Sequence, residues 1–152
     1  MVKEIAGHKT ISTVKKYAEE MLPGEKLADF EKRCKPVEVK EIEGNALIAA
    51  GIDILWSLAC GGAGTHFGAA NAVLSVYAGG SWVNGVLTGG YPTTGGGTGA
   101  AIWKASWSGA SGDGAWTQWK VTNGTQALNT KSEALGTKSG GTWTLEVTIT
   151  IT

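Results

Sequence analysis

The residues of this chain best suited to nucleophilic or metal chemistry are two histidines and two cysteines, and their spacing predicts no site. They lie at four separate positions, and the cysteines lack the CxxC spacing of a zinc or redox motif: His8, Cys34, Cys60 and His66. A nucleophilic site needs a base within hydrogen-bond reach of a serine or cysteine, oriented by a third group. No acidic residue stands near His66 in the sequence. We therefore expect a loop histidine, reduced thiols and no metal ion.

Carboxylates and glycine-rich loops offer equally little for catalysis. Outside the first 43 residues the acidic residues are isolated, with no DxD, DxxE or HExxH grouping: Asp53, Asp113, Glu133 and Glu146. The glycine-rich stretch at 89–99 lacks the GxxxxGK[ST] pattern of a phosphate-binding loop, and no lysine lies between Lys40 and Lys104. The sequence therefore predicts a protein that is not an enzyme and that carries no cofactor.

Charge is distributed very unevenly along the 152 residues. The 13 Lys+Arg balance the 13 Asp+Glu, yet residues 1–43 hold nine of each sign. The other 109 residues hold only eight charges, together with 22 of the 24 glycines and all seven tryptophans. We therefore predict two parts, an amino-terminal interaction arm at 1–43 and a glycine- and tryptophan-rich body at 44–152. A neutral chain with no basic block is not typical of a nucleic-acid-binding protein.

The arm has the apolar spacing of helices. Apolar residues recur at helical intervals and predict helix across 8–33, with Thr10 or Ser12 as the N-cap and an interruption at Pro23-Gly24. Short charged helices are marginal in water, so we expect residues 1–36 either to order against a partner or to stay a mobile terminus. The residues predicted to contact a partner are the apolar ones and the single arginine: Val14, Tyr17, Met21, Leu22, Leu27, Phe30 and Arg33.

Residues 36–43 and 45–60 are predicted to form an extended edge strand and the core helix of the chain. The first stretch alternates apolar and charged residues. The second carries apolar residues at helical intervals, with Asn45 as the N-cap and Gly61-Gly62 in the usual place of a C-cap. This apolar stretch is too short to cross a membrane, which needs ~20 residues. The charged start of the chain does not resemble a secretory signal peptide, and we expect no membrane partner.

The remainder of the chain reads as short strands separated by glycine-rich turns. Strands are predicted at 72–78, 101–107, 115–122 and 142–152, the last with apolar residues at every second position. Asn84-Gly85 and Asn123-Gly124 are tight-turn dipeptides, so Asn123-Gly124-Thr125 is read as a hairpin turn and not as a glycosylation site. The predicted fold is therefore mainly β: an antiparallel β-sandwich body with one packed helix at about 45–60 and an amino-terminal charged helical or extended arm.

The tryptophans are expected to fill the interior of this sandwich. Trp103 and Trp107 share one face of their predicted strand, whereas Trp116 and Trp119 are predicted to lie on opposite faces of the next one. Stacking of exposed tryptophans on sugars is the alternative interpretation.

From residue 36 onwards, about three quarters of the chain resembles small virion structural proteins of tailed bacteriophages. The resemblance rests on spaced features: the run 36–47, Gly51-Ile52, residues 61–65, Phe67, Asn71-Ala72, Val76, Gly90-Tyr91-Pro92, Trp116 and Trp119, Asn123-Gly124, Leu128-Asn129, residues 136–138 and residues 141–145 with the Thr/Ile alternation that follows. The long charged segment 1–35 departs from the usual pattern of that family.

This resemblance implies a non-enzymatic head or tail component. We favour a capsid decoration (cement) protein that binds the major capsid protein and neighbouring copies of itself. Its expected location is the capsid surface of the virion, and the host cytoplasm during assembly. The final strand at 142–152 is a candidate for extending the sheet of a neighbouring molecule. The alternatives are a tail or receptor-binding protein that contacts host glycans, and a cell-wall hydrolase.

Overall fold

The computed structural model describes residues 8–44, 46–97 and 99–151 and shows a mainly β protein. The strands are β1 (His8–Tyr17), β2 (Glu38–Glu43), β3 (Ala46–Leu47), β4 (Val73–Ala78), β5 (Ser81–Asn84), β6 (Val86–Leu87), β7 (Thr93–Thr94), β8 (Ala100–Ser108), β9 (Gly114–Thr122), β10 (Ala127–Lys138) and β11 (Thr142–Ile151). The helices are α1 (Leu27–Arg33) and α2 (Ala49–Ala59).

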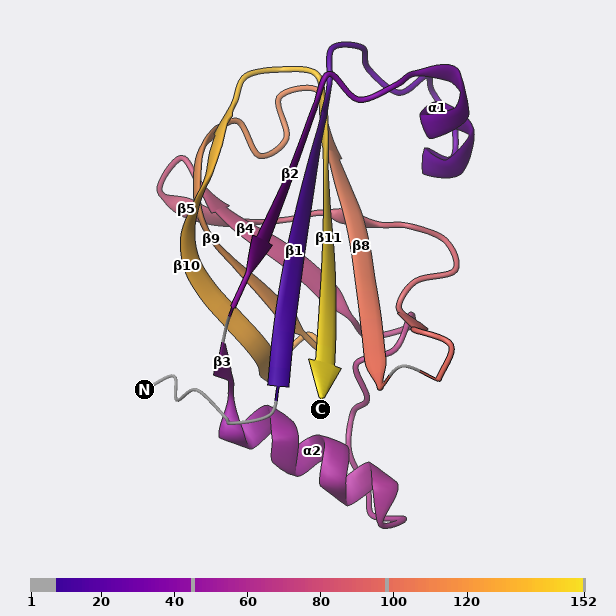
Figure 1. Ribbon diagram of the computed structural model, residues 1–152, viewed down its shortest axis with the longest axis vertical. Coiled ribbons are helices and arrows are strands. Elements are labelled where there is room, and N and C mark those ends of the chain that lie inside the picture. The colour runs from indigo at the N-terminus through magenta and orange to yellow at the C-terminus, as the bar shows by residue number, and fades with distance from the viewer. Residues whose placement is uncertain (1–7, 45, 98, 152) are drawn as a thin grey trace.

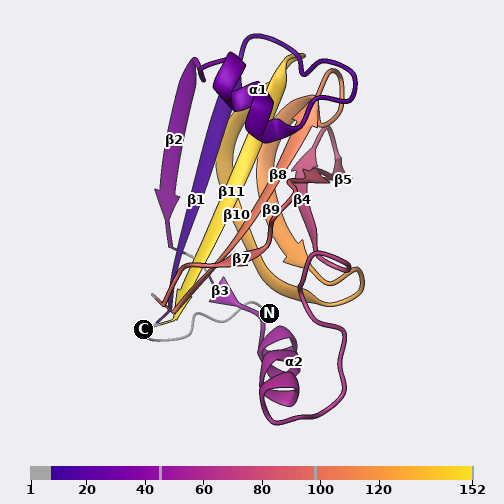
Figure 2. The same ribbon diagram turned by 90° about the vertical axis from the view of Figure 1, so that its right-hand side faces the viewer.

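Two antiparallel sheets face each other, so the predicted β-sandwich is confirmed (Figures 1 and 2). Sheet A has the strand order β2-β1-β11-β8-β6, with β7 also pairing with β8. Sheet B has the order β3-β10-β9-β4-β5. The helix α1 lies beside one end of the sandwich and α2 lies across the opposite end (Figure 1).

The helix predicted across 8–33 is wrong for its first half, because residues 8–17 form strand β1. This strand pairs with β11 along its whole length and with β2 on its other side. Its inward positions are Thr10, Ser12 and Val14, all buried, whereas Lys9 points to solvent. β-branched residues suit a pleated, half-buried surface better than a helix. Of the predicted helical stretch, only the short α1 is helical.

The last strand, β11, shows the predicted alternation, with Trp143, Leu145, Val147 and Ile149 buried. It lies in the interior of sheet A, where its two edges pair with β1 and β8. Both of its backbone edges are therefore occupied, and the prediction that 142–152 extends a neighbour's sheet is wrong.

Tryptophans fill the interior, as predicted. The rings of Trp107 and Trp143 each meet Trp116 edge to face, at centroid distances of 4.9 and 5.0 Å. Trp116 and Trp119 are both fully buried in the same core, contrary to the expectation that they face opposite ways. The pairing register between β9 and β10 shifts between Ser132 and Gly136, which breaks the simple alternation along these strands.

The helix predicted at 45–60 exists as α2 (49–59) and packs on the core through half-buried Ile52, Ile54 and Leu55, but it is less buried than a core helix. Gly51 is buried, whereas the other residues of α2 are half-buried or exposed. Ile48 takes the N-cap position without a side-chain hydrogen bond, and the predicted cap, Asn45, lies outside the described residues. Gly61 follows the helix with a φ of +78°, the left-handed conformation expected at a C-cap.

The two predicted turns have different outcomes. Asn123-Gly124 lies in the hairpin between β9 and β10, where the Asn123 side-chain oxygen accepts hydrogen bonds from the backbone N–H groups of Thr125 and Gln126. Asn84-Gly85 forms no hairpin, because the chain crosses there from β5 in sheet B to β6 in sheet A. At the crossing, a Cβ on Gly85 would lie only 2.6 Å from the Trp107 ring, so glycine allows the close approach.

Candidate partner-binding surfaces

The segment around α1 folds back onto sheet A through a small apolar cluster. Tyr17 at the end of β1 packs edge to face on Phe30 of α1, with ring centroids 4.8 Å apart. Leu27 completes this buried cluster, and Met21 and Cys34 pack against it. Burial of Tyr17 raises the pKa of its phenol, and the neighbouring Glu31 carboxylate adds to that shift.

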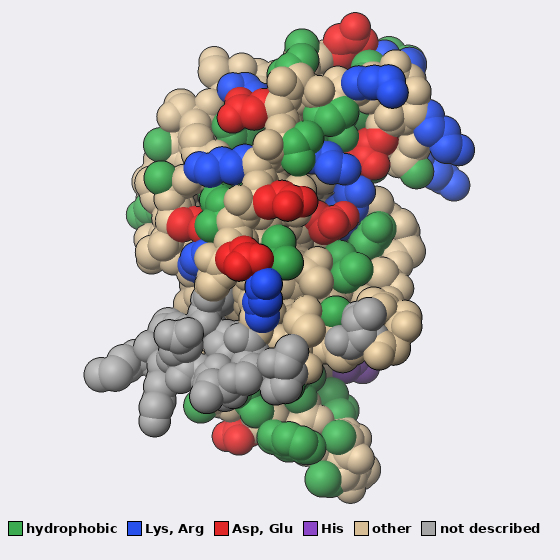
Figure 3. All heavy atoms as spheres, in the orientation of Figure 1, with side chains coloured by type: hydrophobic (Ala, Val, Ile, Leu, Met, Phe, Trp, Pro, Cys, Tyr) green, Lys and Arg blue, Asp and Glu red, His purple; other side chains and the backbone are tan. Residues whose placement is uncertain are grey.

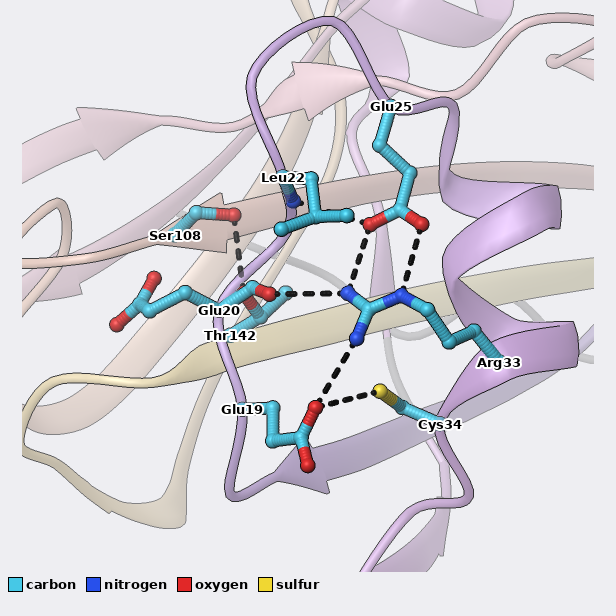
Figure 4. A network of polar contacts seen from close by, with 8 residues as sticks. All are labelled: Glu19, Glu20, Leu22, Glu25, Arg33, Cys34, Ser108 and Thr142. Carbon is cyan, nitrogen blue, oxygen red and sulfur yellow. Dashed lines mark hydrogen bonds and ion pairs between the residues drawn. The ribbon is translucent and has the colours of Figure 1, made fainter.

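Arg33 of α1 forms hydrogen bonds with the segment that connects β1 to α1 (Figure 4). Its Nε and Nη2 atoms donate to the two carboxylate oxygens of Glu25, at 3.0 and 2.9 Å. Nη1 donates to Glu19 at 3.0 Å, and Nη2 also reaches the backbone oxygen of Glu20. The hydrogen bonds from Arg33 lower the pKa of the Glu25 carboxyl. This bidentate pairing fixes the loop on its own helix, which satisfies the arginine within the chain.

A second set of charges connects α1 to the surface of sheet A. Lys104 of β8 lies 3.2 Å from the carboxylate of Glu31 and 3.6 Å from that of Glu146. Burial by itself lowers the pKa of Lys104, but the two carboxylates outweigh it and the net shift is upward. The α1 segment is therefore held by ion pairs as well as by apolar contacts.

Four of the seven predicted partner-contact residues, Val14, Tyr17, Leu27 and Phe30, are buried within the chain. Arg33 is occupied by Glu25 and Glu19, and Met21 is half-buried. Leu22 is 57% exposed and is the member of the set that a partner reaches without moving α1.

The opposite end of the molecule presents a more extensive apolar surface. Trp56 of α2 is 66% exposed, and Ile54, Leu55 and Leu58 are half-buried around it. Asp53 is the one charged residue between Glu43 and Lys104 in the sequence. Figure 3 shows hydrophobic side chains gathered over α2, in contrast to the mixed charges over the sheet. Large exposed apolar patches on a protein commonly mark sites of interaction with another molecule.

Backbone contacts hold α2 against β10 although Gly51 is its one buried residue. Ile48 donates its backbone N–H to the Leu128 carbonyl at 2.9 Å, and β3 pairs with β10 just before the helix. Gly51 lies so close to β10 that a Cβ there would come within 2.7 Å of Leu128 Cα. The exposed face of α2 is therefore presented on a fixed support.

The loop that follows α2 is anchored to the body at two points. Asn123 donates its side-chain N–H to the backbone oxygen of Thr65 at 2.6 Å, and Trp103 donates its indole N–H to that of Phe67 at 3.1 Å. His66 lies in this loop, as predicted, and its Nδ1 accepts the backbone N–H of Gly68 at 3.2 Å. The histidine thus has a structural role in the turn.

A cavity of about 340 Å³ opens beside α2. Its walls come from distant parts of the chain, and the residues that matter most here are apolar: Leu47, Leu55, Phe67, Pro92, Trp103, Leu128 and Ile151. Phe67, Pro92 and Leu128 are widely separated in the sequence, and Gly51 of α2 lies against Leu128. Residues far apart in the sequence therefore meet at the α2 end of the sandwich.

The exposed apolar surface of α2 was not predicted from the sequence, which indicated partner contacts in residues 1–43. One sequence feature could have indicated this exposed apolar surface. Asp53 is the one charged residue between Glu43 and Lys104, and so little charge is unusual for a stretch that includes an exposed helix. No helix within the described residues has the length and apolarity to cross a membrane. Within the same residues, no group of three or more His, Cys, Asp or Glu side chains is placed to hold a metal ion.

Comparison with known proteins identified no protein-family model, no curated protein and no solved structure that matches this chain.

Proposed function

We propose that this protein is a non-enzymatic virion structural protein, a capsid decoration protein that binds and stabilises the shell of the major capsid protein. The observation that carries the proposal is Trp56, exposed on a nearly uncharged helix that is fixed to one end of a rigid β-sandwich. Tryptophan is, with tyrosine and arginine, one of the residue types enriched at the energetic centres of protein interfaces.

Several of the motifs that resemble phage virion proteins lie at the α2 end of the molecule, which supports this end as the contact surface. Gly51, Phe67, Pro92 and Leu128 converge around α2 and its cavity. A protein that stabilises a shell has to present a rigid surface to a fixed lattice, because ordering a flexible segment lowers the affinity. The sandwich supplies that rigidity, and α2 supplies the apolar contact.

Binding of the purified chain to shells of the major capsid protein, assembled without this chain, tests the proposal. Co-sedimentation is expected to show saturable binding at a regular number of copies per shell. Trp56→Ala is expected to weaken binding by roughly tenfold or more, the loss typical of an interface hot spot. Trp82→Ala is the matched control, since Trp82 is an exposed tryptophan of β5, distant from α2 in Figure 1. Saturable binding that Trp56→Ala leaves unchanged would exclude α2 as the contact, and no binding at all would refute the function.

One observation favours the alternative of a tail or receptor-binding protein that contacts glycans. Trp82 is 36% exposed and lies edge to face against Tyr77, with the Lys120 ammonium 4.2 Å above the centre of one of its rings. Exposed aromatic rings stack on sugars, and Trp82 with Tyr77 is the candidate sugar-binding pair. Binding on a glycan array that Trp82→Ala abolishes and Trp56→Ala retains would favour this alternative over the capsid role.

A further inference from the structure

Strand β2 is an open edge of sheet A. It pairs with β1 on one side, and no strand of the described residues pairs with its other side (Figure 2). Val39, in its centre, is 52% exposed. An edge strand carries a row of unpaired backbone groups that is a template for another strand.

The backbone groups that face outward are set by the pairing with β1. Gly44 donates its N–H to the carbonyl of Thr10, and the same register places Ile42 opposite Ser12 and Lys40 opposite Val14. In an antiparallel ladder, hydrogen-bonded pairs alternate with non-bonded ones. The even-numbered residues of β2 therefore bond to β1, whereas Val39 and Glu41 direct their N–H and C=O groups away from the sheet.

Charges allow only one register for a symmetric pairing of two β2 strands. A two-fold axis perpendicular to the sheet places one residue opposite itself. Of the six residues of β2, centring on Glu38, Lys40, Glu41 or Glu43 sets like charges face to face, which is destabilising. Centring on Ile42 sets Glu41 opposite Glu43 twice. Centring on Val39 sets two valines together and faces Glu38 with Lys40 on both sides of the axis.

The surroundings of these two charges are compatible with that arrangement. Glu38 has a long ion pair with Lys16, at 3.7 Å between half-exposed side chains. Lys40 donates to the carbonyl oxygen of Ala134 at 2.8 Å, and among the ion pairs of the described residues none includes it. A second copy would thus give Lys40 a carboxylate partner and extend the row from Lys16 through Glu38.

We propose that two copies of this chain pair edge to edge through β2, antiparallel, with Val39 on the two-fold axis and Glu38 of each copy opposite Lys40 of the other. Sheet A then continues across the dimer through the outward N–H and C=O groups of Val39 and Glu41, whereas the Val37 N–H stays bonded to the Lys16 carbonyl. Charged side chains on an edge strand oppose unselective pairing, and here they select one register. The proposal is independent of shell binding, because β2 and α2 lie on different surfaces of the molecule (Figure 1).

The contact is short, so we expect a weak dimer that forms at high protein concentration. Sedimentation equilibrium of the full chain, up to the millimolar range, tests it. Glu38→Lys and Lys40→Glu each turn two attractive pairs into two repulsive ones and are expected to weaken dimerisation roughly tenfold. The combined variant Glu38→Lys/Lys40→Glu restores opposite charges across the axis and is expected to restore dimerisation. Thermal unfolding confirms that each variant is folded.

Val39→Pro tests the backbone contact separately. The Val39 N–H points away from β1, and proline is tolerated on the solvent side of an edge strand, so the variant is expected to fold and to stay monomeric. A wild-type chain that is monomeric at every concentration would overturn the proposal. So would a combined charge variant that stays dissociated like its single parents, or a dimer that Val39→Pro leaves intact. A dimer lost in Trp56→Ala but retained in the β2 variants would assign self-association to α2 and equally refute this interface.

Discussion

Gly51 of α2 lies against the backbone of Leu128 in β10, so that a Cβ on the glycine would meet Leu128 Cα at 2.7 Å and the Ala127 carbonyl oxygen at the same distance. This contact, with the hydrogen bond from Ile48 to Leu128, sets where the helix lies on the sandwich. Half-buried Ile52, Ile54 and Leu55 add packing against the core, and the exposure of Trp56 depends on this seating of the helix.

Gly51→Ala is therefore expected to destabilise the fold by about 1–3 kcal/mol, the usual cost of overpacking against atoms that cannot yield. Urea unfolding measures this, and shell binding is expected to fall with it because α2 is displaced. Gly89→Ala is the matched control, since a Cβ there meets nothing within 4 Å. Equal stability of the two variants would show that α2 is not seated as described.

Among the apolar contacts of the α1 segment, the Phe30 ring is expected to contribute most. Phe30 is fully buried beside Tyr17, and Phe30→Ala is expected to cost about 3 kcal/mol and to release α1 from sheet A. Hydrogen exchange measures the release as faster exchange of the α1 amides with little change in β11. Leu22→Ala, at an exposed position of the same segment, is expected to change stability by less than about 0.5 kcal/mol. Protected α1 amides in Phe30→Ala would contradict this account.

The strands of the body were predictable because their core residues alternate visibly. In β11, apolar residues from Trp143 to Ile149 occupy every second position, and all of them are buried. Strand β1 lacked that signal. Its inward positions include Thr10 and Ser12, which look solvent-exposed in a sequence, while Ile11 points the other way and completes a helical spacing with Val14.

The long strand β10 and the exposure of α2 were not predicted, for related reasons. Residues from Ala127 to Lys138 show no alternation, because two register shifts against β9 interrupt it. For α2, the helical spacing of apolar residues correctly predicted a helix. The helix is less buried than the spacing indicated. Periodicity specifies which residues share a helix face, whereas the extent to which that face is covered depends on tertiary contacts such as that of Gly51 with Leu128.

Replacing Thr10, whose hydroxyl is buried, is expected to stabilise the fold, whereas most core substitutions destabilise it. Thr10 is fully buried and its Oγ1 has no hydrogen-bond partner among the described residues. Thr10→Val removes an unsatisfied polar group at similar volume and is expected to stabilise the fold by about 1 kcal/mol. Thr142 is equally buried, but its Oγ1 donates to Ser108 Oγ at 3.1 Å. Thr142→Val is therefore expected to destabilise by about 1 kcal/mol, and chemical denaturation that ranks the two variants the other way would refute the assignment.

The last prediction concerns acid stability and the pair formed by Asp113 and Lys138. The Lys138 side chain is completely buried, and its Nζ donates to Asp113 Oδ1 at 2.7 Å. That hydrogen bond, with a smaller contribution from the backbone N–H of Gly140, lowers the pKa of the Asp113 carboxyl in the folded protein. A carboxyl whose pKa is lower when folded contributes stability above its ordinary pKa of about 4, and that contribution disappears as the pH falls through the folded pKa.

Asp113→Asn is consequently expected to be less stable than the wild type at neutral pH, because the buried Lys138 ammonium loses its carboxylate, and to lose less stability on acidification. Thermal unfolding between neutral pH and pH values below about 4 measures both effects. Asp53→Asn removes the same charge at a residue absent from the ion pairs of the described chain, and is expected to follow the wild-type pH profile. If the melting temperatures of Asp113→Asn and the wild type fall in parallel through the acid range, the Asp113 carboxylate does not stabilise the fold through Lys138.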